Sequence, residues 1–537
     1  MKDILLVGYN EMNFIEYERK MRYFGRDNEN FRDFRMCYIN YNHVPYTFPE
    51  LYNEAIRNSN IGSSSFISSK DSFSLTLSTL GSYMHNNGLS FEYIVDFQVE
   101  KTSLYNLLKN EEFRSIGITS TFYTTSQPII EIVKFVRSID ENIPIIIGGP
   151  FVAGIIRTQS KEYINNQLHM LAADYIINSS QGEDTLSKLV SCIRDKGNIA
   201  SINNICYLDK ESNEFVHTNI DIERNKLEDN PPNFALFEDS IVDGLTIRTA
   251  ISCPFSCSFC AFPQHAGDYE VSDIRHIENM MKQIEQIKKI KYINIIDDSF
   301  NVPASRFKEI LAMKIKNGSI FKWNSYIRCQ YLDEEAVMLM KSSGCEGVFL
   351  GIESANQMVL DAMNKRVKIA QYEQGIMLLK KYQIPIFASF IFGFPGETRN
   401  TIEDTIDFIK KFQPDFYRIQ LWYMDKLTPI MNEKIKYRLS GDGFSWEHAT
   451  MNSKEAQDYV EKAFISITES TWLPQHNFDY TGVISLLHKG YSINQITNMI
   501  QIFNKGIYNN ITGDNSYQMN KCDFDSFYQK VNEITNS

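Results

Sequence analysis

The chain has 537 residues, enough for about three or four domains of about 150 residues each. Hydrophobic side chains make up 43% and charged side chains 22%, close to the average of globular proteins, which excludes a fibrous repeat and a disordered chain. The formal net charge of −12 argues against binding a long polyanion, so we expect no nucleic acid partner.

Cysteine content and hydropathy indicate the compartment. Nine cysteines in 537 residues are too sparse for a disulfide-stapled secreted domain, and their odd number prevents complete pairing. No apolar run approaches the roughly 20 residues that span a bilayer, and the run 4–7 does not form the core of a signal peptide. We therefore expect a cytoplasmic protein with no membrane association.

The first 200 residues alternate short β-branched runs with amphipathic segments. This pattern is typical of a parallel sheet flanked by helices, and the apolar face of 128–138 predicts a crossover helix. We predict an α/β, doubly wound, Rossmann-like domain over 1–200 with five strands, at 4–7, 93–95, 115–119, 143–147 and 175–177.

Two loops of this predicted sheet stand out, because ligands bind at the carboxyl ends of parallel strands. One loop contains Ser120 and Phe122, and the other contains Gly148 and Gly149. Paired glycines after a buried strand let a bulky ligand approach the backbone, although a tight turn would explain them equally well.

Three cysteines follow a predicted strand within eight positions, at Cys253, Cys257 and Cys260. Cysteine thiolates are the usual ligands of iron–sulfur clusters, and no fourth cysteine is close in the sequence. Cys329 and Cys345 are interpreted as small buried hydrophobic residues. Three ligands leave one coordination position open, as in a catalytic site. A zinc site or a chance cluster is the alternative.

Strands and helices alternate six times from this point on. The pattern predicts a (β/α)6 partial TIM barrel over 243–430, preceded by a linker at 201–242 and followed by a helical region at 431–537. The predicted strands are 245–250, 292–296, 323–327, 348–352, 386–392 and 416–421. The predicted helices are 274–287, 304–314, 334–342, 370–381 and 401–412.

Charged, hydroxyl and glycine residues follow these strands, at the edge where barrel enzymes place their active sites. A carboxylate there can accept hydrogen bonds from a ligand hydroxyl or ammonium group, although a strand-capping role is the common alternative. The candidates are Asp297 and Asp298 after the second strand, Arg328 after the third, Glu353 and Ser354 after the fourth, Gly393 after the fifth and Thr428 after the sixth.

The C-x-x-x-C-x-x-C spacing, with Phe259 before the third cysteine, resembles the signature of the radical S-adenosylmethionine (SAM) superfamily. This resemblance implies that the three cysteines hold a [4Fe-4S] cluster whose open iron binds SAM, with Phe259 beside the adenine. It also implies that the strand-end residues bind SAM. Reductive cleavage would give a 5′-deoxyadenosyl radical, with electrons from an external donor such as flavodoxin or ferredoxin.

The N-terminal domain resembles cobalamin-binding domains. Ser120-x-Phe122 and Gly148-Gly149 are similar to their Ser-x-Leu and Gly-Gly loops, which surround the nucleotide tail. The Asp-x-His-x-x-Gly signature after the first strand is absent, since this chain has Gly8 to Asn13 without a histidine there. The resemblance therefore implies cobalamin bound without histidine ligation, or a vestigial domain.

The run 257–267, together with segments around Trp446 and Trp472, resembles P-methyltransferases of the phosphinothricin-pathway type. We expect a cobalamin-dependent methyltransferase that acts on an unactivated carbon or a phosphinate centre of a small-molecule or peptide substrate in natural-product biosynthesis. No radical-quenching catalytic residue is identified.

Three other functions stay open. One is a radical SAM maturase, such as an epimerase or cyclase, with a vestigial cobalamin domain. Another is a tRNA methylthiolating enzyme, for which Cys37 and Cys192 do not supply the additional cluster ligands. The last is a structural or sensory metal protein, which would have no use for the ordered strand-end motifs.

Overall fold

The computed structural model describes residues 1–59, 61–62, 65–209, 211–513 and 518–533. The chain forms two compact units, which we describe separately. The first unit contains Met1–Met12, Ser72–Ser252 and Gln264–Lys289. The second unit contains Asn13–Asp71, Cys253–Pro263 and Ile290–Ser537.

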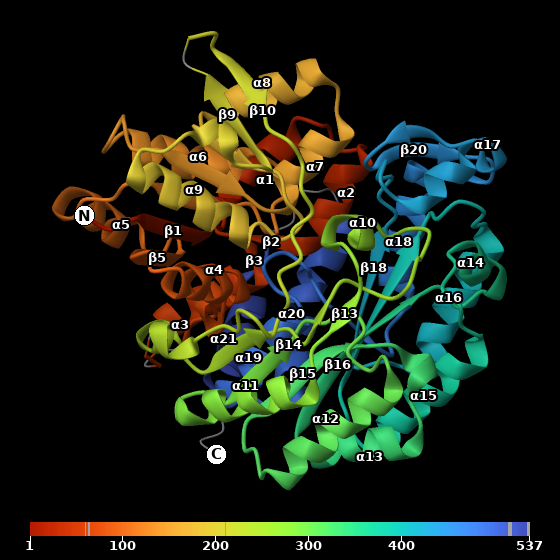
Figure 1. The fold of residues 1–537 in the computed structure, drawn as a ribbon. Helices are drawn as coiled ribbons and strands as arrows, with labels where there is room; N and C mark the ends of the chain where they lie inside the picture. The colour runs from red at the N-terminus through yellow and green to blue at the C-terminus, as the bar shows by residue number, and fades with distance from the viewer. Residues whose placement is uncertain (60, 63–64, 210, 514–517, 534–537) are drawn as a thin grey trace. The chain divides into compact units, whose positions relative to one another are not determined.

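The first unit is built on a sheet of seven strands, five of which are parallel in the order β8-β7-β6-β1-β5. Figure 1 labels β1, β5, β9 and β10 of this sheet. The hairpin β9–β10 extends this sheet antiparallel to β8. The strands are β1 (Ile4–Tyr9), β5 (Phe91–Asp96), β6 (Ile116–Thr119), β7 (Ile145–Gly148), β8 (Tyr175–Ile177), β9 (Ile205–Asp209) and β10 (Glu214–His217).

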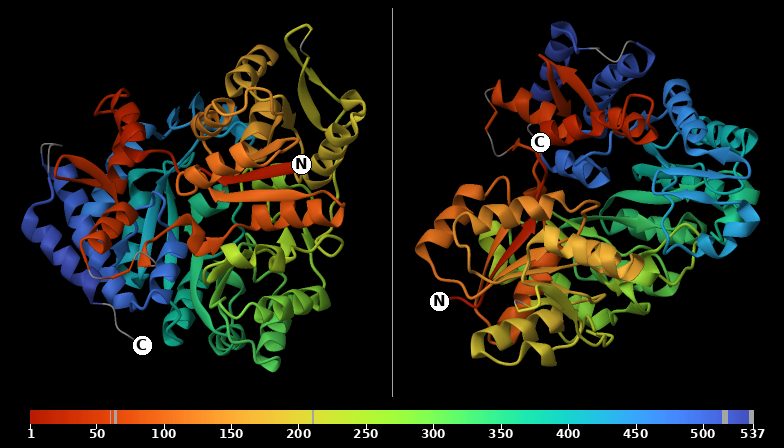
Figure 2. Two further views of the ribbon diagram at one scale, coloured as in Figure 1. Left: turned by 90° about the vertical axis from the view of Figure 1, so that its left-hand side faces the viewer. Right: turned by 90° about the horizontal axis from the view of Figure 1, so that it is seen from above.

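Helices cover both faces of this sheet, as Figure 2 shows. The strand residues Leu5, Val7 and Ile147 share one core with apolar side chains of α5 (Lys101–Asn110), α6 (Gln127–Arg137) and α8 (Lys161–Leu171). On the other face, α4 (Leu75–Asn86) packs against β1, β5 and α9 (Glu183–Asp195). The arrangement is an α/β fold in three layers, because each buried strand presents apolar side chains to both faces.

The second unit contains six parallel strands in the order β22-β18-β17-β16-β15-β14. These are β14 (Tyr292–Ile295), β15 (Lys322–Ile327), β16 (Cys345–Glu353), β17 (Ile386–Phe392), β18 (Phe416–Leu421) and β22 (Thr471–Trp472). The helices between β14 and β18 are α12 (Ala304–Lys316), α13 (Glu334–Ser342), α14 (Gln357–Ala362), α15 (Ile369–Lys381) and α16 (Arg399–Phe412).

One face of this sheet carries a row of aromatic residues in register. Tyr326, Phe349 and Phe387 are neighbours across β15, β16 and β17, with ring centroids 4.9 and 4.8 Å apart along the row. Tyr480, at the start of α19 (Tyr480–His488), contacts all three rings at 5.4 to 6.3 Å. The C-terminal region therefore covers this part of the sheet.

Residues 13–71 pack with the C-terminal helices of the same unit. Phe48, at the start of α3 (Phe48–Arg57), contacts the rings of Phe478, Phe503 and Phe527. The partner elements include α18 (Ser453–Ser466), α20 (Ile493–Thr512) and α21 (Lys521–Asn532). In the interior, Arg418 of β18 donates from Nη2 to Asp33 Oδ1 at 3.0 Å and stacks on Trp472 at 4.2 Å.

These units differ from the expected division at 200, 242 and 430. Residues 13–71 lie in the second unit because the apolar face of α3 is covered there. The expected linker 201–242 lies in the first unit, because β9 pairs with β8. Residue 210 of that linker and residues 514–517 and 534–537 of the expected C-terminal region lie outside the described residues.

Within the residues that the structure describes, we find no helix with the length and apolar character required to span a bilayer.

The Asp33–Arg418 pair yields a stability prediction. Asp33→Ala should destabilise the protein by about 3 kcal/mol, because the Arg418 guanidinium, only 2% exposed, loses its carboxylate. The double variant Asp33→Leu/Arg418→Met should recover most of this loss, because no charge is then buried. The shift of the urea unfolding midpoint measures both effects, and an equal loss in the two variants would contradict the prediction.

Candidate active site

The loop that carries the three cysteines is anchored through Ser258. Its N–H donates to Met363 O at 2.8 Å, its Oγ donates to Ala362 O at 3.0 Å, and its carbonyl accepts from Ile430 N at 3.0 Å. The partners lie in the segments that follow β16 and β18. The cysteines are therefore placed at the carboxyl ends of the second unit's parallel strands, where the sequence predicts an active site.

Each cysteine sulfur has a polar neighbour. Cys257 Sγ accepts from Arg328 Nη2 at 3.1 Å, Cys260 Sγ accepts from Phe262 N at 3.4 Å, and Cys253 Sγ lies 3.7 Å from Ser299 Oγ. N–H donors at a sulfur stabilise its thiolate form, which is the form that binds iron. All nine cysteines are free thiols.

The described part of the chain contains no group of three His, Cys, Asp or Glu side chains close enough to hold one metal ion. A cluster makes a different demand, because each of its thiolates binds a separate iron. Burial, with smaller contributions from the nearby Cys257, Asp298 and Cys253, raises the pKa of Cys260 to about 11, although the Phe262 N–H lowers it in part. The donor set therefore fits an iron–sulfur cluster, whose positive iron atoms would offset this effect.

Arg328 is fixed from several sides. Its backbone N–H donates to Asn301 Oδ1 at 2.9 Å, and its carbonyl accepts from Asn301 Nδ2 at 2.8 Å. Its guanidinium lies 3.5 Å from the ring centroid of Phe255 and donates to Lys365 O at 3.3 Å. Since the side chain is 9% exposed, the donor to Cys257 is held in one orientation.

Glu353 forms a buried ion pair at the end of β16. Lys365 Nζ donates to Glu353 Oε1 at 2.7 Å and lies 5.4 Å from the ring centroid of Phe259. A Cβ atom at Gly351 would come within 2.5 Å of the Glu353 carboxylate, so this glycine makes room for the pair. The predicted residues Phe259 and Glu353 are thereby brought together through Lys365.

Asp297 and Asp298 follow β14 and differ in exposure. Asp297 is buried at 3% exposure, whereas Asp298 is exposed. Loss of hydration and the Asp297 carboxylate raise the pKa of Asp298 to about 7, an effect that solvent screening at an exposed side chain limits.

The turn after β17 contains a buried carboxyl group. Glu397 is fully buried, and its Oε2 accepts from Gly393 N at 2.6 Å, whereas its Oε1 has no hydrogen-bond partner among the described residues. Burial raises the pKa of Glu397 to about 8. Gly393 has a φ of +88°, and a Cβ atom there would meet Trp446 at 2.4 Å, so no larger residue fits.

Two predicted site residues are engaged in local structure. Ser354 Oγ accepts from Asn356 N at 3.2 Å and lies 3.4 Å from Thr405 Oγ1. Thr428 Oγ1 donates to Asp425 O at 2.5 Å within a turn. Both hydroxyls therefore have structural partners.

A second candidate site lies in the first unit, at the carboxyl ends of β6 and β7. Ser120 N donates to Gly148 O at 2.7 Å, so the two predicted loops meet. Gly149 has a φ of +109°, and a Cβ atom there would lie 2.9 Å from Ser120 Oγ. Phe122 is 82% exposed with a φ of +71°, so its ring is presented to solvent.

Sequence reasoning missed Lys365, Asn301 and Glu397. The short segment between α14 and α15 contains two lysines, of which Lys365 is buried and Lys368 is exposed. The sequence pattern does not distinguish a buried lysine from an exposed one in such a charged segment. Glu397 follows the predicted residue Gly393 by four positions, in the sequence Gly-Phe-Pro-Gly-Glu-Thr, and a carboxylate so close to a predicted strand end is a signal that the sequence does carry.

Comparisons with known proteins agree with this geometry. Residues 247–409 match the sequence profile of the Radical SAM superfamily. A methyltransferase of Pyrococcus horikoshii, itself uncharacterized, is 25% identical over 385 residues, which cover 68% of this chain and 81% of the relative.

Two solved structures share the fold. The radical SAM methyltransferase TsrM from Kitasatospora setae, with cobalamin and a [4Fe-4S] cluster bound, has a TM-score of 0.56 at 15% identity and covers 80% of this chain and 77% of its own. The cobalamin-dependent radical enzyme OxsB, with aqua-cobalamin and SAM bound, has a TM-score of 0.53 at 18% identity and covers 81% of this chain and 60% of its own.

The cysteine loop at the ends of parallel strands fits an iron–sulfur cluster, and residues 247–409 match the radical SAM superfamily, which defines the chain as an enzyme of this chemical class.

Glu397 predicts a pH effect on stability. The carboxyl group stays protonated in the folded protein up to about pH 8 but ionises near 4.5 in the unfolded chain, so raising the pH favours unfolding between these values. Glu397→Gln should remove this loss, so its stability relative to the natural protein should rise by about 1.4 kcal/mol per pH unit. Thermal midpoints at pH 5.5, 6.5 and 7.5 check this, and a difference that does not change with pH would refute it.

Arg328 predicts an effect on the cluster. Arg328→Gln should shift the reduction potential to more negative values by about 60 mV, equivalent to about 1.4 kcal/mol for one electron, because Cys257 loses a charged hydrogen-bond donor. A redox titration followed by electron paramagnetic resonance measures this potential. An unchanged potential in a variant with full iron content would show that the hydrogen bond has no such role.

Proposed function

We propose that this chain is a cobalamin-dependent radical SAM methyltransferase. The observation that carries the proposal is the presence of two separate sites, each at the carboxyl ends of parallel strands. The cysteine loop of the second unit fits a [4Fe-4S] cluster. The loops around Ser120 and Gly149 in the first unit form a backbone-lined site with an exposed aromatic ring.

The residues around the cysteine loop have distinct proposed roles. Cys253, Cys257 and Cys260 hold the cluster, which when bound supplies the electron for reductive cleavage of SAM. Asp297 and Asp298 lie at the strand end where a carboxylate can hold the ammonium group of SAM, and the Glu353–Lys365 pair presents both charges beside Phe259. Arg328 orients Cys257.

The first unit is proposed to bind cobalamin without a histidine ligand. After β1, Asn10 is buried and donates from its backbone to Tyr123 Oη at 2.6 Å and from Nδ2 to Pro128 O at 2.9 Å. The loop after β1 therefore holds a buried asparagine whose backbone N–H and side-chain amide are both hydrogen-bonded. Bound cobalamin would supply a methyl carrier, and the loop after β1 would offer it no histidine ligand.

The proposed reaction is transfer of a methyl group to an unactivated carbon or a phosphinate centre of a small-molecule or peptide substrate in natural-product biosynthesis. TsrM and OxsB, which share the fold, are cobalamin-bound radical SAM enzymes, and TsrM is a methyltransferase. A maturase with a vestigial cobalamin domain is the second candidate, which the missing histidine favours.

Anaerobic purification with cluster reconstitution and added hydroxocobalamin tests the proposal. We expect near-stoichiometric cobalamin and about four iron atoms per chain, with methyl transfer as the reaction class. A full cluster without cobalamin would refute the methyltransferase and leave the maturase.

Two variants should separate the cofactors. Cys257→Ala should lose the cluster and all SAM cleavage but keep cobalamin. Gly149→Ala should lose cobalamin but keep the cluster, because its Cβ atom would lie 2.9 Å from Ser120 Oγ at a backbone angle that only glycine adopts freely.

Gly148→Ala is the matched control. Its Cβ atom would meet only Ile177, at 3.5 Å, and should be tolerated. Absorbance spectra and metal analysis measure both cofactors. Equal loss of cobalamin in Gly148→Ala and Gly149→Ala would contradict the assignment of the cobalamin site to Gly149.

A further inference from the structure

We propose that an exposed basic surface beside the cysteine loop is the docking site for an acidic protein that carries one electron. We call it the basic surface, and it consists of Arg366, Lys368, Lys434, Lys436 and Arg438. The inference rests on the proposed function, because a cluster that cleaves SAM must be reduced.

The cysteine loop faces solvent on one side. Pro254 and Ser256 are exposed, and Cys253 and Cys260 are half-buried, whereas Cys257 is only 5% exposed. A cluster on these cysteines would therefore lie close to the surface of the second unit along this loop. A donor protein that touches the loop would bring its own redox group near the cluster.

The basic surface continues from the two segments that hold the loop. Asn364 Nδ2 donates to Ser256 O at 2.8 Å, and Arg366 follows two residues later, within about 7 Å of chain. Ile430 N donates to Ser258 O, and a 3₁₀ turn over Pro429–Glu433 leads to Lys434, about 8 Å further along its axis. The cations thus flank the loop on both of its anchored sides.

The local charge is opposite to that of the chain as a whole. The five cations of the basic surface are exposed. The segments that carry them, 361–368 and 429–438, contain two carboxylates, Asp361 and Glu433, and Glu433 forms an ion pair with Lys436. The whole chain has a formal charge of −12. A positive patch on an acidic protein steers an acidic partner to that place and repels other surfaces.

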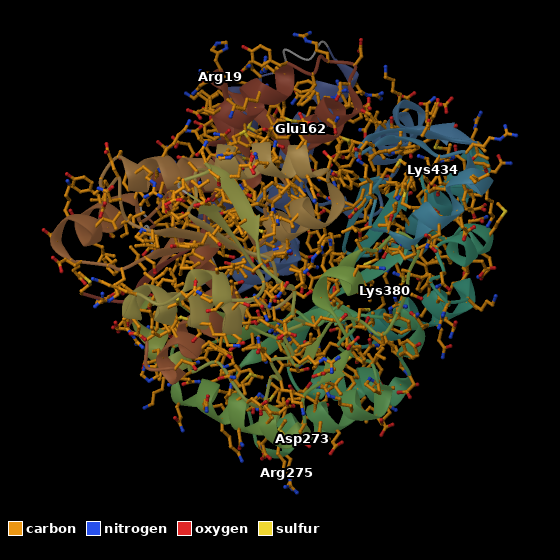
Figure 3. The ribbon with its side chains drawn as sticks, turned by 45° about the horizontal axis from the view of Figure 1, so that its top comes forward. Arg19, Glu162, Asp273, Arg275, Lys380 and Lys434 are labelled. Carbon is orange, nitrogen blue, oxygen red and sulfur yellow. The ribbon has the colours of Figure 1, made fainter. Side chains whose placement is uncertain are left out.

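An apolar residue lies within this charged surface. Ile435 is 95% exposed between Lys434 and Lys436 in α17 (Lys434–Tyr437), and Figure 3 labels Lys434 on this segment. The ring of Tyr437, the last residue of this helix, packs against Gly396, where a Cβ atom would lie 3.2 Å from it. Apolar residues at the centre of a charged rim are typical of transient protein interfaces.

The proposed step transfers one electron. The carrier protein is oxidised by one electron, the cluster is reduced by one electron, and no covalent bond or proton changes place. The carrier is defined by its chemistry, as an acidic protein with a one-electron flavin or iron–sulfur group.

Charge reversal combined with two kinds of reductant tests this surface. In Lys434→Glu/Lys436→Glu, formation of 5′-deoxyadenosine driven by a reduced flavodoxin or ferredoxin should fall about tenfold at low salt, because these rim charges control association. The same reaction driven by dithionite, a small molecule that needs no docking, should stay unchanged. Lys316→Glu/Lys521→Glu, with the same charge change on α12 and α21, is the matched control and should behave like the natural protein.

Direct binding gives a second readout that does not depend on turnover. The dissociation constant for each carrier protein, measured by calorimetry on the reconstituted protein, should rise about tenfold in Lys434→Glu/Lys436→Glu and not in the control. Unchanged binding, or equal weakening in both variants, would overturn the docking site. Absence of dithionite-driven SAM cleavage in the natural protein would instead refute the proposed function, and the binding result would still decide the docking site.

Discussion

The two backbone hydrogen bonds of Ser258 are the constraint on which the candidate site depends. They join the cysteine loop to Met363 and Ile430, in the segments that follow β16 and β18. A short loop of three cysteines has no regular structure of its own, so its sulfur atoms can be placed only by neighbours. Because those neighbours lie at the ends of a packed parallel sheet, the thiols are held in a fixed position relative to the sheet core.

Buried charges surround this loop and are paired in a way that stability alone does not explain. An ion pair such as Lys365 with Glu353 loses solvation on burial, and apolar residues of the same size are often equally stable there. Arg328 meets a ring and a sulfur instead of a carboxylate. Both arrangements suit a site that receives a ligand with charges of its own, because the protein dipoles are already oriented when it arrives.

Strands β14 to β18 could be predicted because each is a short apolar run, and helices with an apolar face follow the first four of them. The two-residue strand β22 could not be predicted, because Thr471–Trp472 is too short to show a pattern. Residues such as Arg328 and Glu353 could be placed at strand ends by counting alone. The hydroxyl of Ser354 could not be assigned in this way, because its neighbours within the turn and on α16 decide whether it is available. Nor could residues 13–71 be placed, since hydropathy indicates that α3 has an apolar face but not which distant helices cover it.

The location of residues 13–71 in the second unit, which is completed by the C-terminal helices, has a consequence for biosynthesis. A ribosome releases α3 early, yet Phe503 and Phe527, which cover its apolar face, leave the exit tunnel only after nearly the whole chain has been made. Contacts this distant in sequence slow folding, and the uncovered face is open to aggregation in the meantime. The nascent chain is therefore expected to need a chaperone, and an N-terminal truncation past residue 13 removes strand β1 of the first unit together with part of the second unit.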